Sequence, residues 1–448
     1  MNAASNFTNN KISIIGLGYV GLPLAIAFSK TMNVVGFDIS TTRINELKNG
    51  FDNKNESSKE ELLHPNLSFT NVSNDLLGSD CYIIAVPTPI DNTFNPDLTN
   101  LLDASKLVGE NLKASFKKNN SATIPLIIYE STVFPGCTEE ECIPVIDKES
   151  GLENGKDFKV GYSPERVNPG DPDHLLQNIK KVISGQDHET VVRISALYET
   201  ILEAGIHIAP NIKTAEAVKL IENVQRDVNI AFINEMAIFL QNLNIQTSDV
   251  MDAAKTKWNY LDFEPGLVGG HCIPVDPHYL NFKATSVGAR SSLVDASRII
   301  NDSMGPYVAR KTLSFLGTNE SNYAPASYEI LILGATFKGN VTDLRNSSVI
   351  KIVEELEKLN CRVSVFDPLV EKKMLNESGL PGINDPFLDD KKYNAVIIAV
   401  SHDFFKNVPL ESYVQLLDAK IGTSVITDVK RILNWKKDGF PDVTYWTL

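Results

Sequence analysis

This 448-residue sequence lacks the even number of cysteines that is typical of a disulfide framework, and it lacks metal-binding cysteine motifs. The five cysteines are an odd number and form no C-x-x-C pair: Cys81, Cys137, Cys142, Cys272 and Cys361. This usage argues against a disulfide-stabilised framework and predicts reduced thiols in a reducing compartment, so we expect a cytoplasmic protein. His271 and His278 flank Cys272 without a further clustered set of ligands, so no metal site is predicted.

An excess of positive charge is also missing. The formal net charge of -14 argues against a nucleic-acid partner or an anionic membrane surface. The apolar run over residues 12–28 is interrupted by three glycines and Pro23, so we expect neither a membrane span nor a targeting segment. With 43% hydrophobic and 22% charged residues, the chain is expected to form two or three globular domains.

A glycine-rich turn stands in the first α/β pattern. A buried strand over residues 12–15 leads into Gly16-Leu17-Gly18-Tyr19-Val20-Gly21, and a helix pattern follows. Such a turn brings peptide N–H groups and a helix N-terminus to a pyrophosphate. The next strand, residues 34–37, ends in Asp38, which is placed to bind a ribose diol and favours NAD over NADP. Arg43 lies nearby and is compatible with either cofactor.

Three further expected strands end in polar loops. Strand 81–86 is followed by Pro87-Thr88-Pro89, strand 124–129 by Glu130-Ser131-Thr132, and strand 158–162 by Ser163-Pro164-Glu165-Arg166. Ligands bind at the carboxyl edge of the parallel sheet in such folds. Ordinary turn prolines and hydroxyls explain the first two loops equally well. Glu165 is a candidate base or ligand carboxylate.

A long helix is predicted over residues 211–243. Lys219 and Asn223 are four residues apart and share a face, so an ammonium and an amide can converge on one substrate oxygen. A solvated surface pair is the plainer interpretation of the same spacing. Residues 248–316 are also mainly helical and are a candidate dimerisation region.

One stretch interrupts this helical region: Gly266-Leu267-Val268-Gly269-Gly270-His271-Cys272-Ile273-Pro274-Val275-Asp276-Pro277. Its glycines allow a backbone to approach a ligand closely. A thiol is followed four residues later by a carboxylate, which indicates covalent chemistry on a small ligand. A buried, unreactive cysteine is the common alternative.

A second α/β pattern begins near Pro325. Strands are expected over residues 330–333, 362–366, 396–400 and 425–428, with a helix over residues 347–359. The loop over residues 334–346 holds Lys338 and Arg345, which lie where a phosphate would dock. Two nucleotide-type domains on either side of a helical middle indicate two nucleotide-bearing ligands, one of which is NAD.

In this order, the motifs resemble the UDP-glucose/GDP-mannose dehydrogenase family. The sequence of residues 269–277 is similar to that of the UDP-N-acetylhexosamine 6-dehydrogenase branch of this family. The resemblance implies an α/β chain with two Rossmann-like doubly wound domains, joined by a long helix and a central all-helical dimerisation domain. We expect an NAD-binding domain over residues 11–210, a central domain with the cysteine loop over residues 211–320, and a UDP-sugar-binding domain over residues 325–448.

The resemblance also implies an activity. Two NAD molecules in turn would take four electrons from the C6 alcohol of UDP-GlcNAc or UDP-GalNAc and leave a carboxylate. Cys272 would add to the intermediate aldehyde as a thiohemiacetal and then form a thioester, which water would hydrolyse. Lys219 and Asn223 would stabilise the oxyanion, and the water would be handled by Asp276, Thr132 and Glu165.

Binding residues are implied in the same way. The expected cofactor contacts are Gly16, Gly18, Tyr19, Val20, Gly21, Asp38, Arg43, Pro87, Thr88, Thr132 and Arg345. The expected substrate contacts are Glu165, Arg166, Lys219, Asn223, Gly266, Gly269, Gly270 and Lys338, with Lys257 supplied by the neighbouring subunit of a homodimer or larger homo-oligomer. Val275 stands where many UDP-glucose enzymes carry a lysine, which disfavours a glucose substrate.

Two alternatives to this activity stay open. A β-hydroxyacid dehydrogenase shares the glycine turn and the lysine–asparagine pair, but it transfers a single hydride without a thiol. The Cys272 loop and the second α/β domain weigh against it. A non-catalytic NAD-sensing protein would bind NAD and produce no NADH from nucleotide sugars.

Overall fold

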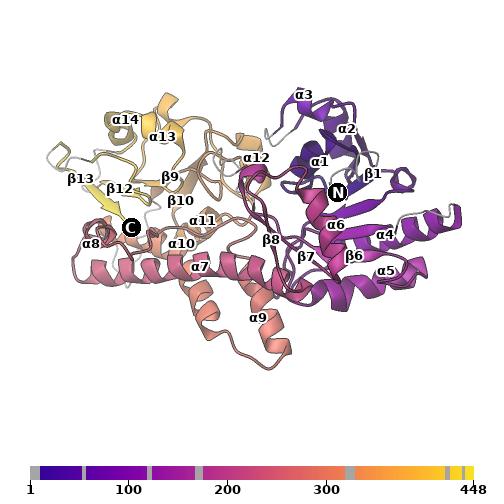
Figure 1. Cartoon of the computed structure of the whole chain (residues 1–448). Helices are drawn as coiled ribbons and strands as arrows, with labels where there is room; N and C mark the ends of the chain where they lie inside the picture. Colours follow the sequence, from indigo (N-terminus) through magenta and orange to yellow (C-terminus); the bar gives the residue numbers. More distant parts are fainter. Residues whose placement is uncertain are drawn as a thin grey trace. The chain divides into compact units, whose positions relative to one another are not determined.

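The structure is a computed structural model that describes residues 11–52, 57–118, 124–166, 175–317, 328–418, 424–435 and 439–448 (Figure 1). Pro325, near which the second α/β pattern was expected to begin, lies outside these residues. The chain divides into two compact units. The first consists of Met1–Glu222 and His278–Arg290, and the second of Asn223–Pro277 and Ser291–Leu448.

The first unit is built on an eight-stranded sheet with the order β3-β2-β1-β4-β5-β6-β7-β8. Its neighbouring strands are parallel except for the antiparallel pair β6 and β7. The strands are β1 (Lys11–Ile15), β2 (Asn33–Phe37), β3 (Leu67–Thr70), β4 (Cys81–Ile84), β5 (Leu126–Tyr129), β6 (Lys159–Tyr162), β7 (Lys181–Gly185) and β8 (Ile206–Ile208).

The central strands of this sheet are mostly apolar because both of their faces are buried. Ile12, Ile14 and Ile83 are fully buried, as expected for parallel strands that are covered on both faces. The strand order reverses between β1 and β4, and ligands of such folds bind at the carboxyl ends of the strands beside this reversal. The glycine turn after β1 and the proline loop after β4 both lie at this edge.

Helices of the first unit connect these strands. They are α1 (Gly21–Ser29), α2 (Thr41–Lys48), α3 (Lys59–Leu62), α4 (Thr99–Lys118), α5 (Ile143–Ser150) and α6 (His188–Tyr198), with short turns η2 (Ser73–Leu76), η3 (Thr138–Cys142) and η4 (Leu176–Asn178). The helices α4 and α5 pack side by side (Figure 1). The long helix α7 (Ile212–Asn242) and the helix α9 (Asp276–Ser286) each contribute residues to both units.

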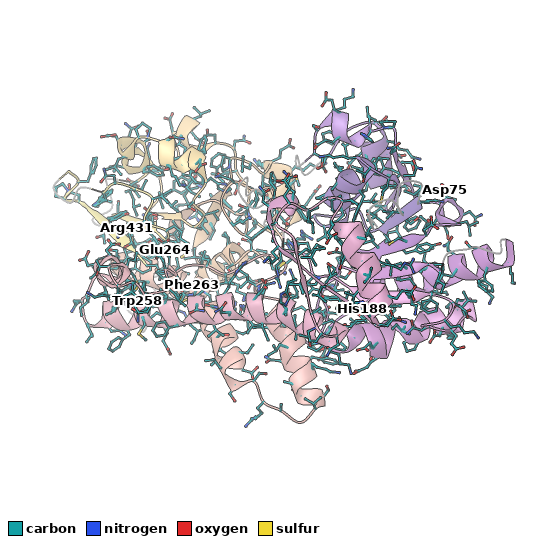
Figure 2. The ribbon with its side chains drawn as sticks, viewed as in Figure 1. Asp75, His188, Trp258, Phe263, Glu264 and Arg431 are labelled. Atoms are coloured by element: carbon teal, nitrogen blue, oxygen red, sulfur yellow. The ribbon has the colours of Figure 1, made fainter. Side chains whose placement is uncertain are left out.

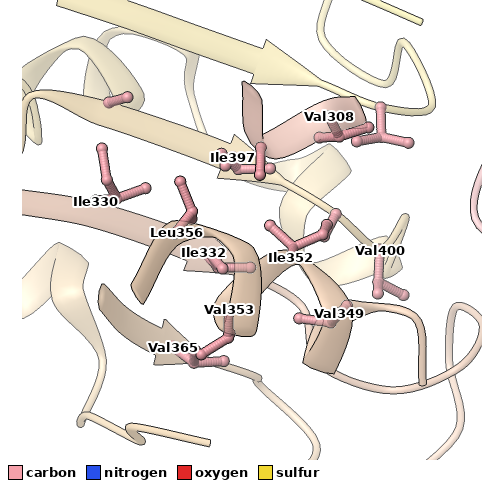
Figure 3. Packing of buried hydrophobic residues seen from close by; sticks show 14 of the residues in the cluster. Val308, Ile330, Ile332, Val349, Ile352, Val353, Leu356, Val365, Ile397 and Val400 are labelled. Atoms are coloured by element: carbon pink, nitrogen blue, oxygen red, sulfur yellow. The ribbon is translucent and has the colours of Figure 1, made fainter. Parts of the chain in front are cut away.

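The second unit contains a five-stranded parallel sheet with the order β10-β9-β11-β12-β13. Its strands are β9 (Glu329–Leu333), β10 (Arg362–Phe366), β11 (Ala395–Ile398), β12 (Ser424–Asp428) and β13 (Val443–Thr447). Figure 3 shows the apolar core, in which Ile332 of β9 and Ile397 of β11 face Ile352 and Leu356 of α11 (Val349–Lys358).

The remaining helices of the second unit are α8 (Thr247–Lys255), α10 (Ser292–Phe315), α12 (Lys372–Glu377), α13 (Asp403–Asn407) and α14 (Leu410–Gln415), with the turn η5 (Pro386–Leu388). Helix α10 packs against α11, and both helices belong to the unit of the second sheet. The expected mixed α/β class is confirmed. The division into three domains stays a prediction.

Differences from the expected elements have local causes. Strands expected to reach residues 86 and 400 end at Ile84 and Ile398, because the chain then turns into the loops at the sheet edge. The strands β3, β7, β8 and β13 were not expected, since they are short or interrupted by polar residues. Of the helices in the described ranges, none combines the length and hydropathy needed to cross a membrane.

Candidate active site

The glycine turn after β1 leaves no room for side chains. Gly16 has φ +93°, and a Cβ atom there would lie 2.7 Å from the carbonyl oxygen of Ala85. A Cβ atom on Gly21 would lie 1.8 Å from the carbonyl oxygen of Gly16. Gly18, Tyr19 and Val20 are only partly buried between these two positions. The bare backbone is therefore available to a ligand at the N-terminus of α1, as dinucleotide binding requires.

Asp38 retains capacity for a ligand. Its carboxylate accepts hydrogen bonds from the backbone N–H groups of Leu17 at 3.0 Å and Ser40 at 2.9 Å, and the residue is only partly buried. A carboxylate has about four acceptor positions, so two remain for the hydroxyls of a ribose. The residues of this edge therefore fit NAD.

Arg43 stabilises the glycine turn after β1 from its buried side. Its guanidinium is buried, donates to the carbonyl oxygen of Leu17 at 3.2 Å, and forms an ion pair with Asp52 at 2.7 Å. These contacts hold the backbone of the turn. A direct contact between Arg43 and the cofactor stays a prediction.

The loops after β4 and β5 are bonded to each other. The hydroxyl of Thr88 donates to the carbonyl oxygen of Thr132 at 2.7 Å, and that of Ser131 donates to the carbonyl oxygen of Val86 at 2.7 Å. The side chain of Thr132 is partly exposed, and Pro87 is exposed. The structure thus brings the predicted residues Pro87, Thr88 and Thr132 together at one sheet edge.

Glu165 and Lys219 are in contact within the first unit. The ammonium of Lys219, which is nearly buried, donates to the carbonyl oxygen of Glu165 at 3.0 Å and lies 3.7 Å from its carboxylate. Arg166 forms an ion pair with Glu222. Among the described residues, no hydrogen-bond partner reaches the buried Oε1 of Glu165 or the buried Nη2 of Arg166. Such orphaned buried atoms fit a polar ligand or a water molecule.

Glu130 is a supporting residue that the sequence predictions missed. It is buried, and its carboxylate accepts from Lys181 at 2.8 Å and from the hydroxyl of Tyr198. Lys181 also donates to the carbonyl oxygen of Pro164, directly before Glu165, at 3.2 Å. Burial raises the pKa of Glu130, and the ion pair with Lys181 opposes this effect. A charged residue directly after a fully apolar strand was the available signal.

Glu216, three residues before Lys219, was also missed. Its buried carboxylate accepts from the backbone N–H groups of Gly136 at 2.5 Å and Thr138 at 2.9 Å, where the loop after β5 enters η3. Burial raises the pKa of Glu216 to about 7, although the hydrogen bonds from Thr138 and Gly136 oppose the shift. This contact fastens α7 to the loop that carries Thr132.

In the second unit, side chains hold the glycine stretch through its backbone. Asn234 of α7 accepts from the N–H of Gly266 at 2.8 Å and donates to its carbonyl oxygen at 3.0 Å. Asn346 donates to the carbonyl oxygen of Gly270 at 3.0 Å, and Ser348 donates to that of Val268. These contacts determine the path of the chain towards Cys272.

Cys272 is partly exposed at the turn that enters α9. Its carbonyl oxygen accepts from the N–H groups of Val275 at 3.0 Å and Asp276 at 2.9 Å. The side chain of Asn223 donates to the carboxylate of Asp276 at 2.5 Å, and both residues are buried. The structure therefore joins two predicted catalytic residues, Asn223 and Asp276, at the start of the helix that follows the thiol.

The remaining predicted residues of the second unit are more exposed. Lys338 is partly buried in the loop after β9, and Arg345 pairs with Asp343 at 2.6 Å. Lys257 is exposed next to Trp258, whose side chain lies at the surface near α8 (Figure 2). Within the described parts of the chain, no group of three or more histidine, cysteine or acidic residues could hold a metal ion.

Lys430, which was not predicted, contacts the glycine stretch. It follows β12, and its ammonium donates to the carbonyl oxygen of Pro265 at 2.9 Å. Burial lowers the pKa of Lys430. Its position 165 residues downstream in the sequence explains why no local pattern indicated this contact.

Comparison with known proteins covers most of the chain. Three models of the UDP-glucose/GDP-mannose dehydrogenase family match: the NAD binding domain at residues 10–202, the central domain at 213–303 and the UDP binding domain at 331–435. The UDP-N-acetyl-D-glucosamine 6-dehydrogenase of Salmonella typhi is 46% identical over 90% of this chain and 92% of its own. The enzyme of the same name from Pseudomonas aeruginosa is 45% identical over 95% and 98%. A solved UDP-D-ManNAc dehydrogenase from Pyrococcus horikoshii has a TM-score of 0.84 at 30% identity, covering 97% and 98%.

The buried carboxylate of Glu216 predicts that the free energy of unfolding depends on pH. Because the pKa of Glu216 is about 7 in the folded chain and about 4.5 when exposed, the folded chain binds this proton more tightly. The resulting stabilisation is complete below pH 4.5 and is lost as the pH rises through 7. At about 1.4 kcal/mol for each pH unit, the loss is about 3 kcal/mol.

The Glu216→Gln variant should lack this pH dependence. Urea denaturation of both proteins between pH 4.5 and 8 measures the difference. Glu110→Gln, which removes an exposed acid of α4, is the matched control and should follow the wild type. Parallel pH profiles for the wild type and Glu216→Gln would contradict the prediction.

Proposed function

The chain belongs to the UDP-glucose/GDP-mannose dehydrogenase family and is an NAD-dependent nucleotide-sugar dehydrogenase, and from this premise we propose that it oxidises the C6 hydroxyl of UDP-N-acetylglucosamine to a carboxylate. The observation that carries this choice is the identity of 45–46% with two enzymes named for that substrate. Identity with the solved UDP-D-ManNAc enzyme is 30%. Val275, in place of a lysine, further disfavours glucose.

NAD supplies the electron acceptor: when bound, it takes a hydride in each of the two oxidations. Gly16 and Gly21 would receive its pyrophosphate, because they expose bare backbone at the N-terminus of α1. Asp38 would hold a ribose through its two remaining acceptor positions. Thr88 and Thr132, which are joined at the same edge, are the proposed contacts for the nicotinamide side.

Cys272 is the proposed nucleophile. An aldehyde carbon bears no alkoxide that could expel a second hydride, and addition of the thiolate creates one in a thiohemiacetal. The oxidised product is a thioester, which water cleaves to the free acid and the thiol. The position of Cys272 before α9 supports this role, since the N-terminus of a helix favours negative charge.

Side chains on α7 would stabilise the charge that develops on oxygen. Lys219 and Asn223 lie one helical turn apart on α7, and both are almost completely buried. We assign them to the oxyanion of each step. The bond from Asn223 to Asp276 supports a role for this carboxylate in orienting the water. Within the first unit, the orphaned Oε1 of Glu165 supports the assignment of this residue to a water contact.

A homodimer and a cytoplasmic location complete the proposal. Phe232 and Phe239 of α7 and Leu293 and Ile299 of α10 are large apolar side chains that are more than half exposed. Exposed large apolar side chains on these two helices support a subunit interface there. Lys257 is then the candidate for a contact with the neighbouring subunit's substrate. The five free cysteines support a reducing compartment.

The substrate proposal predicts a specific stoichiometry. With a panel of UDP-GlcNAc, UDP-GalNAc, UDP-ManNAc and UDP-glucose, NADH formation should be at least about 10-fold faster with UDP-GlcNAc. Two NADH should appear for each sugar consumed. One NADH for each sugar would favour the single-hydride alternative, and NAD binding without any NADH would favour the non-catalytic one.

Replacement of the proposed nucleophile should stop the reaction before the acid. A serine hydroxyl is not ionised as a thiol is, so Cys272→Ser should lower the rate of uronic acid formation by about 10³-fold or more. Product analysis by mass spectrometry measures this rate. Cys361→Ser, at a buried cysteine directly before β10, is the matched control. Unchanged acid formation by Cys272→Ser would refute the thiol mechanism.

If the apolar surface of α10 forms the dimer interface, a charged side chain introduced on that surface should dissociate the dimer. Ile299→Asp should weaken dimerisation by at least about 100-fold, because an unpaired carboxylate would be desolvated at the interface. Light scattering coupled to size-exclusion chromatography measures the mass. Ser314→Asp, at an exposed position near the end of α10, is the matched control. A dimer that persists in Ile299→Asp at low micromolar concentration would place the interface elsewhere.

A further inference from the structure

The second sheet repeats the glycine turn of the first. Gly334 follows β9 with φ +89°, as Gly16 follows β1 with φ +93°. The N–H of Gly334 donates to the carbonyl oxygen of Phe366 at 2.8 Å, and that of Gly16 donates to Phe37 at 2.8 Å. In both sheets the acceptor is the last residue of the neighbouring parallel strand. The two units therefore share one local design at this edge.

The carboxylate after the second strand is repeated as well. Asp367 follows β10 as Asp38 follows β2. Asp367 accepts from the N–H of Ala335 at 2.7 Å, and Asp38 accepts from that of Leu17 at 3.0 Å. In each case the donor is the residue directly after the turn glycine. On this geometry alone, Asp367 occupies the position of a ribose ligand.

The two carboxylates differ in exposure and in the hydrogen bonds that they accept. Asp38 is partly exposed and accepts two hydrogen bonds, whereas Asp367 is 3% exposed. Besides Ala335, its oxygens accept from the N–H of Thr336 at 3.4 Å, the N–H of Leu369 at 2.9 Å and Nε2 of His402 at 3.0 Å. Three of these four donors reach Oδ2 and one reaches Oδ1, so the buried carboxylate is held by groups of its own unit. Although burial raises the pKa of Asp367, its hydrogen bond to His402 contributes to a net lowering.

His402 fills the position beside Asp367 that the first sheet leaves open. It is buried, and its Nδ1 accepts from the N–H of Asn340 at 3.0 Å. Nε2 therefore carries the proton and donates to Asp367. Nε2 also lies 3.2 Å from the hydroxyl of Thr336, which donates to the carbonyl oxygen of Lys338 at 2.8 Å. One imidazole thus holds residues on both sides of Lys338.

The loop held in this way supports the glycine stretch. A Cβ atom on Gly270 would lie 2.8 Å from the ring of Phe337, and one on Gly269 would lie 3.1 Å from its Cβ. On the other side, a Cβ atom on Gly339 would lie 2.7 Å from the carbonyl oxygen of Ser401. The loop has no space to shift without displacing Gly269 and Gly270.

We propose that His402 is a positioning residue for the UDP-sugar: by occupying Asp367, it converts the second glycine turn from a ribose site into a rigid mount for Phe337 and Lys338. The inference rests on the proposed function in that a UDP-sugar is the ligand of this unit. Loss of the imidazole would remove one contact from each of Thr336 and Asn340, which keep their bonds to Asp367, Lys338 and Asp403, so the loop would be held less firmly against the glycine stretch.

Direct binding of UDP tests the inference without any dependence on which sugar is oxidised. Calorimetry of UDP and, separately, NAD should give an affinity for UDP about 10-fold lower in His402→Ala than in the wild type, with NAD affinity unchanged. His402→Gln retains an N–H donor for Asp367 and should recover UDP affinity to within about threefold. Ile397→Val, in the core of β11, is the control for general destabilisation and should bind both ligands normally.

The outcomes separate positioning from folding. Unchanged UDP affinity in a folded His402→Ala, or an equal loss for UDP and NAD, overturns the proposal. A comparable loss of UDP affinity in Ile397→Val also overturns it. If His402→Ala does not fold, Thr336→Val removes the hydroxyl beside the imidazole and should lower UDP affinity about threefold on its own. If UDP-GlcNAc is not the substrate, the UDP-binding results expected here do not change.

Discussion

The hydrogen-bonded ladder of α7 is the constraint on which the placement of the proposed catalytic groups of this helix depends. This helix carries Glu216, Lys219, Asn223 and Asn234 at spacings set by a rise of about 1.5 Å per residue. Glu216 fastens it to the loop after β5, and Asn234 fastens it to the glycine stretch. On α7, the proposed oxyanion pair therefore lies between two residues whose side chains hold neighbouring loops.

Buried charge maintains this arrangement in the second unit. Asp227 of α7 is fully buried and accepts from Arg298 and Asn301 of α10. Asn301 in turn accepts from Asn234, the residue that holds Gly266. An unpaired charge in this position would be costly, so every partner in the chain of contacts is needed. The position of the glycine stretch thus depends on α10 as well as on α7.

The two glycine turns illustrate how similar backbones acquire different uses. A turn glycine and a following aspartate occur in both sheets, yet Asp38 is partly exposed and accepts two hydrogen bonds, whereas Asp367 is buried. At Asp367, one buried histidine and three backbone N–H groups bind the carboxylate, which is itself buried. A motif in the sequence therefore indicates a possible ligand, while the neighbours in space decide whether the ligand can bind.

The sequence by itself determined the α/β class, the glycine turn with Asp38, and the family, because these depend on local patterns of apolar residues and on motifs of a few residues. Only the tertiary structure decided the support of the site. Glu130 with Lys181, Asn234 with Gly266, and His402 with Asp367 are pairs more than 30 residues apart in sequence. No local periodicity connects such partners, since they meet only when distant strands and helices pack and bury their polar groups together.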